Sequence, residues 1–160
     1  MTFRVLLAVV FDIVATAVLF FAFVRGGRPE RVGGLINLAG LVASTLFRLV
    51  APSVNWAPAA VSILAIDVVV AGGFFWLGVT TIRFWPIWAA GFALADLFMS
   101  ICGALLPRVS LFAYHTGLGI YAYLALGALA LGTFRLAPHA EPHIRNGSRR
   151  LWLRHLEETS

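Results

Sequence analysis

The segment LAIDVVVAGGFFWLG, residues 64–78, decides the fold class, because it has the apolar character of a membrane helix yet carries one carboxyl group, Asp67. A charged side chain at the centre of a bilayer costs about 2.5–3.5 kcal/mol on insertion scales. An acid at that depth is therefore a candidate for a helix-pairing or functional role.

The composition of the whole chain supports the same class. Of its 160 residues, 61% are hydrophobic and 12% are charged, and the mean hydropathy is +0.91. An ordinary soluble domain has about 25% charged residues. All twelve basic residues are arginine, which suits phosphate headgroups and carboxylates. The sequence thus predicts an integral membrane protein with the lipid bilayer as a partner, and the pI near 10.7 does not require nucleic acid.

Apolar stretches long enough to cross about 30 Å of hydrocarbon occur five times. Short connections containing Gly, Pro, Asn or Arg separate them. The fold class expected is all-α, a polytopic bundle of five transmembrane helices in residues 1–134, followed by a basic tail in residues 135–160. The predicted spans are residues 5–24, 33–50, 59–79, 86–106 and 111–131.

Arginine placement predicts the orientation of this bundle. Three arginines fall on one side of the predicted spans and nine on the other, and the positive-inside rule places the richer side in the cytoplasm. We therefore expect a bacterial inner-membrane protein with a periplasmic N-terminus and a cytoplasmic C-terminus. The nine are Arg25, Arg28, Arg31, Arg83, Arg135, Arg145, Arg149, Arg150 and Arg154.

Two pairs of similar segments suggest an internal duplication. DIVATAVLFFAFV begins at Asp12 and DVVVAGGFFWLGV at Asp67, an offset of 55, while LAGLVAS (38–44) is followed by LADLFMS (94–100) at an offset of 56. The offsets predict two and a half helical-hairpin repeats. Chance similarity between apolar segments is the alternative.

Three acids share one predicted depth in the bilayer. At about 1.5 Å of rise per residue, Asp12, Asp67 and Asp96 all fall within about 5 Å of the midplane. Thr16 and Ser100 each follow an acid by four residues, so they share its helical face. These five residues are expected either to bond helices together or to bind protons or cations.

Small residues indicate where helix backbones approach each other closely, because association within lipid depends on packing rather than on the hydrophobic effect. The candidates are Ala39, Gly40, Ala43, Ser44, Gly72 and Gly73.

The segment RFWPIW, residues 83–88, predicts membrane-interface anchors at Arg83, Trp85 and Trp88. From here through ALALGTFR, over residues 80–136, the chain resembles small multi-spanning inner-membrane proteins of Gram-negative bacteria with a similar Arg-aromatic-Trp-Pro-aliphatic-Trp segment. The resemblance implies an inner-membrane location and no particular activity.

The tail contains a predicted amphipathic helix after Ser148, with Trp152 as a further interface anchor lying on the inner leaflet. Docking of this helix to a partner protein is the alternative. The spacing His139-x-Glu141-x-His143 is not expected to bind metal, because Pro142 interrupts it.

Enzyme signatures such as HExxH, GxSxG and a phosphate-binding glycine loop are absent from the sequence, so no enzyme activity and no catalytic residue are expected. The preferred function is a non-catalytic accessory or stabilising subunit that packs against a larger membrane complex. The alternative is a small oligomeric transporter or channel that uses the intramembrane acids for protons or cations. Binding of quinone, pigment or a specific lipid leaves no short motif, so the cofactor stays unknown.

Overall fold

The computed structural model describes residues 3–50, 57–105, 111–137 and 139–159, and this part of the chain is helical without any strand. Five long helices are followed by two short ones. They are α1 (Phe3–Arg25), α2 (Arg28–Val50), α3 (Ala57–Thr80), α4 (Trp85–Leu105), α5 (Leu111–Phe134), α6 (Pro142–Asn146) and α7 (Arg149–Thr159).

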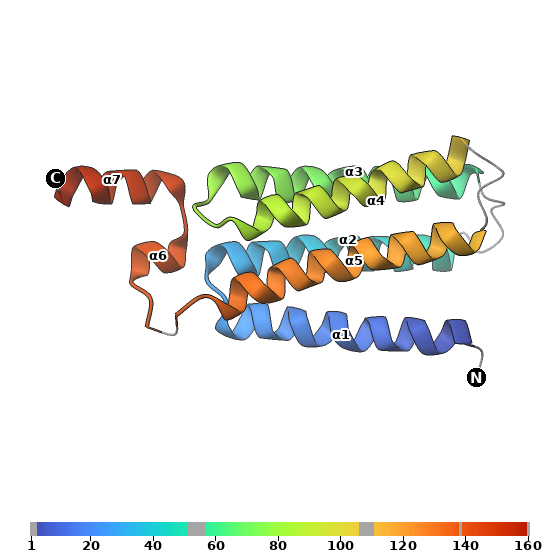
Figure 1. The fold of residues 1–160 in the computed structure, drawn as a ribbon, viewed down its shortest axis with the longest axis horizontal. Coiled ribbons are helices and arrows are strands. Elements are labelled where there is room, and N and C mark those ends of the chain that lie inside the picture. Colours follow the sequence, from blue (N-terminus) through green and yellow to red (C-terminus); the bar gives the residue numbers. More distant parts are fainter. Residues whose placement is uncertain (1–2, 51–56, 106–110, 138, 160) are drawn as a thin grey trace.

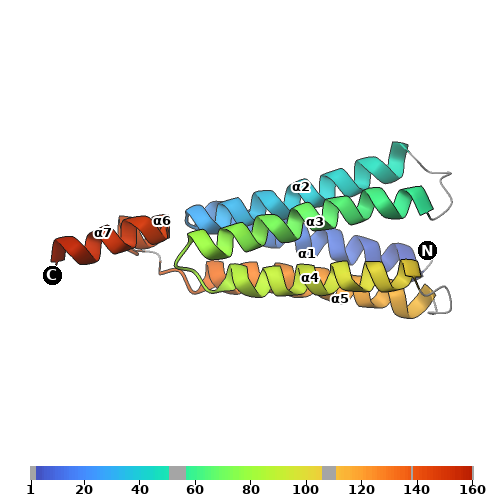
Figure 2. The same cartoon turned by 90° about the horizontal axis from the view of Figure 1, so that it is seen from above.

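The five long helices run side by side as an up-and-down bundle, and α6 and α7 lie beyond one end of it (Figures 1 and 2). The N-terminus lies at the opposite end (Figure 1). Helix α4 packs closely on both α3 and α5, whereas α1 rests on α5 and α2 at the side of the bundle. The short α1–α2 and α3–α4 connections, together with the end of α5, therefore face the tail.

Helix positions agree closely with the predicted apolar stretches, but α2 begins at Arg28 rather than near residue 33. Pro29 and Glu30 explain the earlier start. Proline is favoured in a first helical turn because its missing N–H needs no partner there, and an acid is favoured near a helix N-terminus by the helix dipole.

Two helices of the described residues are long and apolar enough to cross a membrane. These are α3, over Val61–Thr80, and α4, over Trp85–Cys102, while α5 contains a shorter apolar stretch, Ile120–Phe134. The helical bundle is confirmed, and membrane crossing by the five long helices stays a prediction, as does the duplication.

The outer surface of the bundle is strongly apolar. Ile13, Phe20, Phe75 and Phe98 are each more than 60% exposed, on three different helices. A monomeric soluble protein rarely leaves a large contiguous apolar surface in water. Exposure of this kind is consistent with a membrane location.

The buried core gathers at the end of the bundle that faces the tail. Trp85, at the start of α4, is 1% exposed and meets the fully buried ring of Phe74 edge to face, with ring centroids 6.3 Å apart. The indole also lies directly against Gly33 of α2 and Gly132 of α5. A side chain at either glycine would collide with the ring, so these two positions make room for the core tryptophan.

Candidate functional site

The three acids predicted to lie within the membrane do not form one cluster. Asp67 of α3 and Asp96 of α4 are half-buried and interact electrostatically across the packed helix pair. Asp12 is exposed on α1, which packs on α2 and α5. The predicted shared layer therefore divides into an internal pair and one outward-facing acid.

The internal acid pair and Asp12 have different polar neighbours. Ser100 lies one turn beyond Asp96 and is buried at 8% exposure, whereas Thr16 is exposed on the face of Asp12. Oδ1 of Asp96 is buried and has no hydrogen-bond partner among the described residues. The internal pair thus has an acceptor available for a proton or a cation, and the outer acid has a polar companion on the same surface.

Two of the predicted small residues do bring helix backbones together. A Cβ atom added at Gly40 would lie 2.8 Å from Cγ2 of Val70, and one added at Gly73 would lie 3.2 Å from Cδ1 of Ile36. Both contacts join α2 to α3. These glycines therefore allow the close packing that the sequence predicts.

Other members of the predicted packing set behave differently. Gly72 is exposed, with open space where a Cβ would stand, and Ala39 is exposed as well. These two residues therefore do not contribute to the α2–α3 contact within this chain, and a packing role for them stays a prediction. Ala43 and Ser44 are half-buried.

Glu30 is a fully buried acid that the sequence did not predict as a site, and it makes several polar contacts among the described residues. Glu30 is 0% exposed, and its Oε1 accepts a hydrogen bond from the indole Nε1 of Trp85 at 3.1 Å. Its Oε2 accepts from the backbone N–H of Gly27 at 3.0 Å. The guanidinium Nε of Arg83 lies 3.5 Å from Oε1 and completes an ion pair. We call Glu30, Arg83 and Trp85 the loop clasp, because they join the α1–α2 connection to the α3–α4 connection.

The loop clasp contains two of the predicted interface anchors, and only Trp85 lacks the exposure that an anchor needs. Trp85 is buried in the core instead of lying at the membrane surface, because its N–H is needed by Glu30 and its ring fits between two glycines. The side chain of Arg83 is 18% exposed, because its charge is paired with the buried carboxylate. Trp88 is 60% exposed, as an interface anchor would be.

The tail is docked beside the loop clasp by two hydrogen bonds to its backbone carbonyls. Arg83 Nη2 donates to the carbonyl oxygen of Ile144 at 3.0 Å, and the N–H of Ile82 donates to the carbonyl oxygen of Gly147 at 2.9 Å. Gly147 has a φ of +64°, a left-handed conformation that favours glycine. Glycine is also required at position 27, where a side chain would strike the carbonyl of Arg145. The tail is therefore packed against this end of the bundle.

Docking of the tail leaves an arginine-lined pocket of about 490 Å³ beside the α1–α2 connection. Its walls include Arg28 and Arg31 of α2 and Arg145 of α6. Guanidinium groups bind phosphate oxygens through paired hydrogen bonds. The pocket therefore has the chemistry for a phosphate or another oxyanion.

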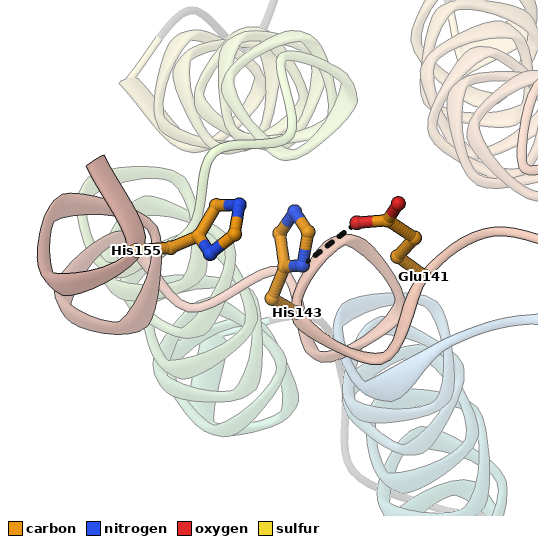
Figure 3. A group of neighbouring side chains, drawn as sticks. All are labelled: Glu141, His143 and His155. Atoms are coloured by element: carbon orange, nitrogen blue, oxygen red, sulfur yellow. Dashed lines mark ion pairs between the residues drawn. The ribbon is translucent and has the colours of Figure 1, made fainter. Parts of the chain in front are cut away.

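A second polar group lies on the tail itself and joins α6 to α7. Figure 3 shows His143 between Glu141 and His155. His143 Nδ1 lies 3.3 Å from Glu141 Oε2, and the rings of His143 and His155 are stacked with centroids 4.2 Å apart. The sequence predicted no metal site at His139, Glu141 and His143 because Pro142 interrupts a regular helix there, and in the structure this proline begins α6. His155, twelve positions after His143, could not be associated with it by spacing alone.

The sequence contains a signal for the position of Glu30, although the segment was predicted to be a connection between two helices. The residues RGGRPE, 25–30, combine two glycines with a Pro-Glu pair directly before a helix, which is a helix-start pattern. The pattern could have shown that Glu30 begins α2. Its partners, 53 and 55 positions later at Arg83 and Trp85, could not have been read from local spacing.

Comparisons with protein-family models, with characterised proteins and with solved structures give no match to this chain.

Proposed function

We propose that this chain is a non-catalytic integral membrane protein that crosses a bacterial inner membrane five times and serves as an accessory subunit of a larger membrane complex. Its contact with another subunit is made by the outward face of α1. The observation that carries the proposal is the exposed carboxyl group of Asp12, two residues from the middle of that helix.

An exposed acid at this depth is costly for a helix surrounded by lipid. The midpoint of α1 is residue 14, so Asp12 lies about 3 Å from it along the axis. Its exposed neighbours are Thr16, one turn away, and the apolar Ile13 and Phe20. A helix of another subunit that offers a donor to Asp12 would remove the cost of placing a carboxyl group against hydrocarbon.

Site-specific crosslinking in native membranes tests this contact. A photoreactive residue at Ile13, 63% exposed on α1, is expected to yield one discrete adduct with a different membrane protein. The matched control is Val69, 73% exposed near the middle of α3, which is expected to yield none. Asp12→Leu should weaken the Ile13 adduct, since leucine removes the polar contact. Equal crosslinking from both positions, or adducts only with further copies of this chain, would contradict the proposal.

A second candidate function is favoured by the internal acid pair. Asp67 of α3 and Asp96 of α4 interact electrostatically, and one carboxylate oxygen of Asp96 has no hydrogen-bond partner in the described part of the chain. Such a pair suits a proton- or cation-linked transporter. Asp96→Asn keeps a hydrogen-bonding side chain that cannot titrate. This variant should fold but should no longer support ion flux into liposomes. Flux that is absent from the unaltered protein, or unchanged in the variant, excludes transport by this pair.

The proposed orientation places the tail and the loop clasp in the cytoplasm. It follows from the nine-to-three distribution of arginines on the two sides of the predicted spans. Alkaline phosphatase fused after Ser160 should be inactive, because the enzyme folds only outside the cytoplasm. Activity from this fusion would place the tail outside and overturn the orientation.

A further inference from the structure

The group formed by Glu141, His143 and His155 has the donor chemistry of a metal site. Each residue offers one ligand atom, and the three atoms lie within 4.8 Å of one another. Two imidazole nitrogens and a carboxylate oxygen form a ligand set found in zinc proteins, which leaves a fourth position for water. We propose that these residues bind a divalent transition-metal ion, zinc fitting best, and that the ion ties α6 to α7.

The distances require only a small closure. Tetrahedral zinc with bonds of about 2.0–2.1 Å separates its ligand atoms by about 3.3 Å, so the widest of the three gaps must shorten by about 1.5 Å. The two rings are now stacked with an interplanar angle of 26°. Rotation of each ring about its side-chain bonds directs one nitrogen of each toward a shared ion. These side chains are half-buried or exposed, so they have room to rotate.

An open pocket gives the ion a route to the site. A space of about 400 Å³ is lined by both imidazoles and by Asn146. Oδ1 of Asn146 is buried and has no hydrogen-bond partner among the described residues. Because this oxygen is not exposed to the open space, it is not counted among the ligands. Glu158 and Arg154 also line the space, so their opposite charges offset each other there.

The position of the site indicates what the ion does. His143 belongs to α6, which is held to the loop clasp through Ile144, whereas His155 belongs to α7. A shared ion therefore fixes the amphipathic α7 relative to the bundle end. Because the inference depends on tail residues alone, it stands independently of the proposed contact through α1.

Calorimetric titration of zinc into the untagged, chelator-treated full-length protein in detergent tests the site. One ion per chain is expected. His143→Ala and His155→Ala should each weaken binding by about 10-fold or more, since even outer-shell partners of ligating histidines contribute about 10–100-fold. Glu141→Gln should also weaken binding, while His139→Ala, an exposed tail histidine outside the group, is the matched control and should leave it unchanged.

Trp152 supplies a local readout that separates this site from binding elsewhere. Its ring centroid lies 5.6 Å from that of His143 and 6.4 Å from that of His155. Copper, which occupies such ligand sets and quenches nearby indoles, should quench the unaltered protein and leave Trp152→Phe nearly unaffected. Absence of saturable zinc binding, or equal binding by the His143→Ala/His155→Ala double variant, would overturn the proposal. A loss in His139→Ala as large as that in His143→Ala would do the same.

Discussion

Trp85 joins the packing of the bundle to its polar chemistry. Its ring occupies the space left by Gly33 and Gly132, and its N–H donates to the buried Glu30. The six-membered ring of the indole lies against Gly33 and the five-membered ring against Gly132, so a shift of the side chain would disturb the hydrogen bond to Glu30. We therefore expect the glycines beside it to tolerate substitution poorly.

Gly132→Ala should destabilise the protein by about 1–3 kcal/mol, because the added methyl overpacks a rigid ring. Gly127→Ala is the matched control on α5, since nothing lies within 4 Å of its added Cβ. This control should be neutral or stabilising by at most about 1 kcal/mol, because alanine favours helix. Denaturant unfolding in detergent micelles measures both. Equal stabilities of the two variants would show that Trp85 is not held between the glycines.

Arg83→Ala should cost about 3–5 kcal/mol, because it leaves the 0% exposed carboxylate of Glu30 without its cation. Arg149→Ala removes an exposed tail arginine and should change stability by no more than about 0.5 kcal/mol. Adding Glu30→Gln to the Arg83→Ala variant should recover part of the loss, since the buried group is then neutral. If the losses in the free energy of unfolding of the two single variants simply add in the double variant, the two charges do not interact.

At the scale of the elements, the sequence predicted the long helices well. The apolar stretches, and the Gly, Pro and Arg residues between them, predicted the ends of all five long helices to within about five residues. They could do so because length and hydropathy are local properties. The start of α7 directly after Ser148 was also predicted correctly. Docking of the tail was not predicted, because the hydrogen bonds from the Arg83 side chain to Ile144 and from the Ile82 N–H to Gly147 join segments that are distant in the sequence.

Tail docking can be trapped chemically. Thr81 and Ser148 form an isolated antiparallel bridge, which places their Cα atoms within the range of about 4.4–6.8 Å that a disulfide needs. In a Cys102→Ser background, Thr81→Cys with Ser148→Cys should form a disulfide rapidly under mild oxidation. Thr80→Cys with Ser148→Cys is the control, since Thr80 turns its hydroxyl back to its own helix. Similar oxidation rates for both pairs would show that the tail is not held at Thr81.

At the scale of the whole molecule, the division of the acids is the observation on which the proposed function rests. Sequence position placed Asp12, Asp67 and Asp96 at one depth but could not give the direction in which each side chain points, because that depends on the rotation of each packed helix. The structure puts two acids together on α3 and α4 and leaves the third on the outer surface of α1. An outward acid in an apolar surface is the feature that a subunit contact explains best.

Native mass spectrometry of complexes extracted from membranes in mild detergent tests the subunit proposal most directly. The account predicts a stoichiometric complex of this chain with a different membrane protein, which Asp12→Leu dissociates while Asp67→Leu, if it folds, leaves it intact. A species that contains only this chain, as monomer or homo-oligomer, and is unaffected by Asp12→Leu would contradict the account.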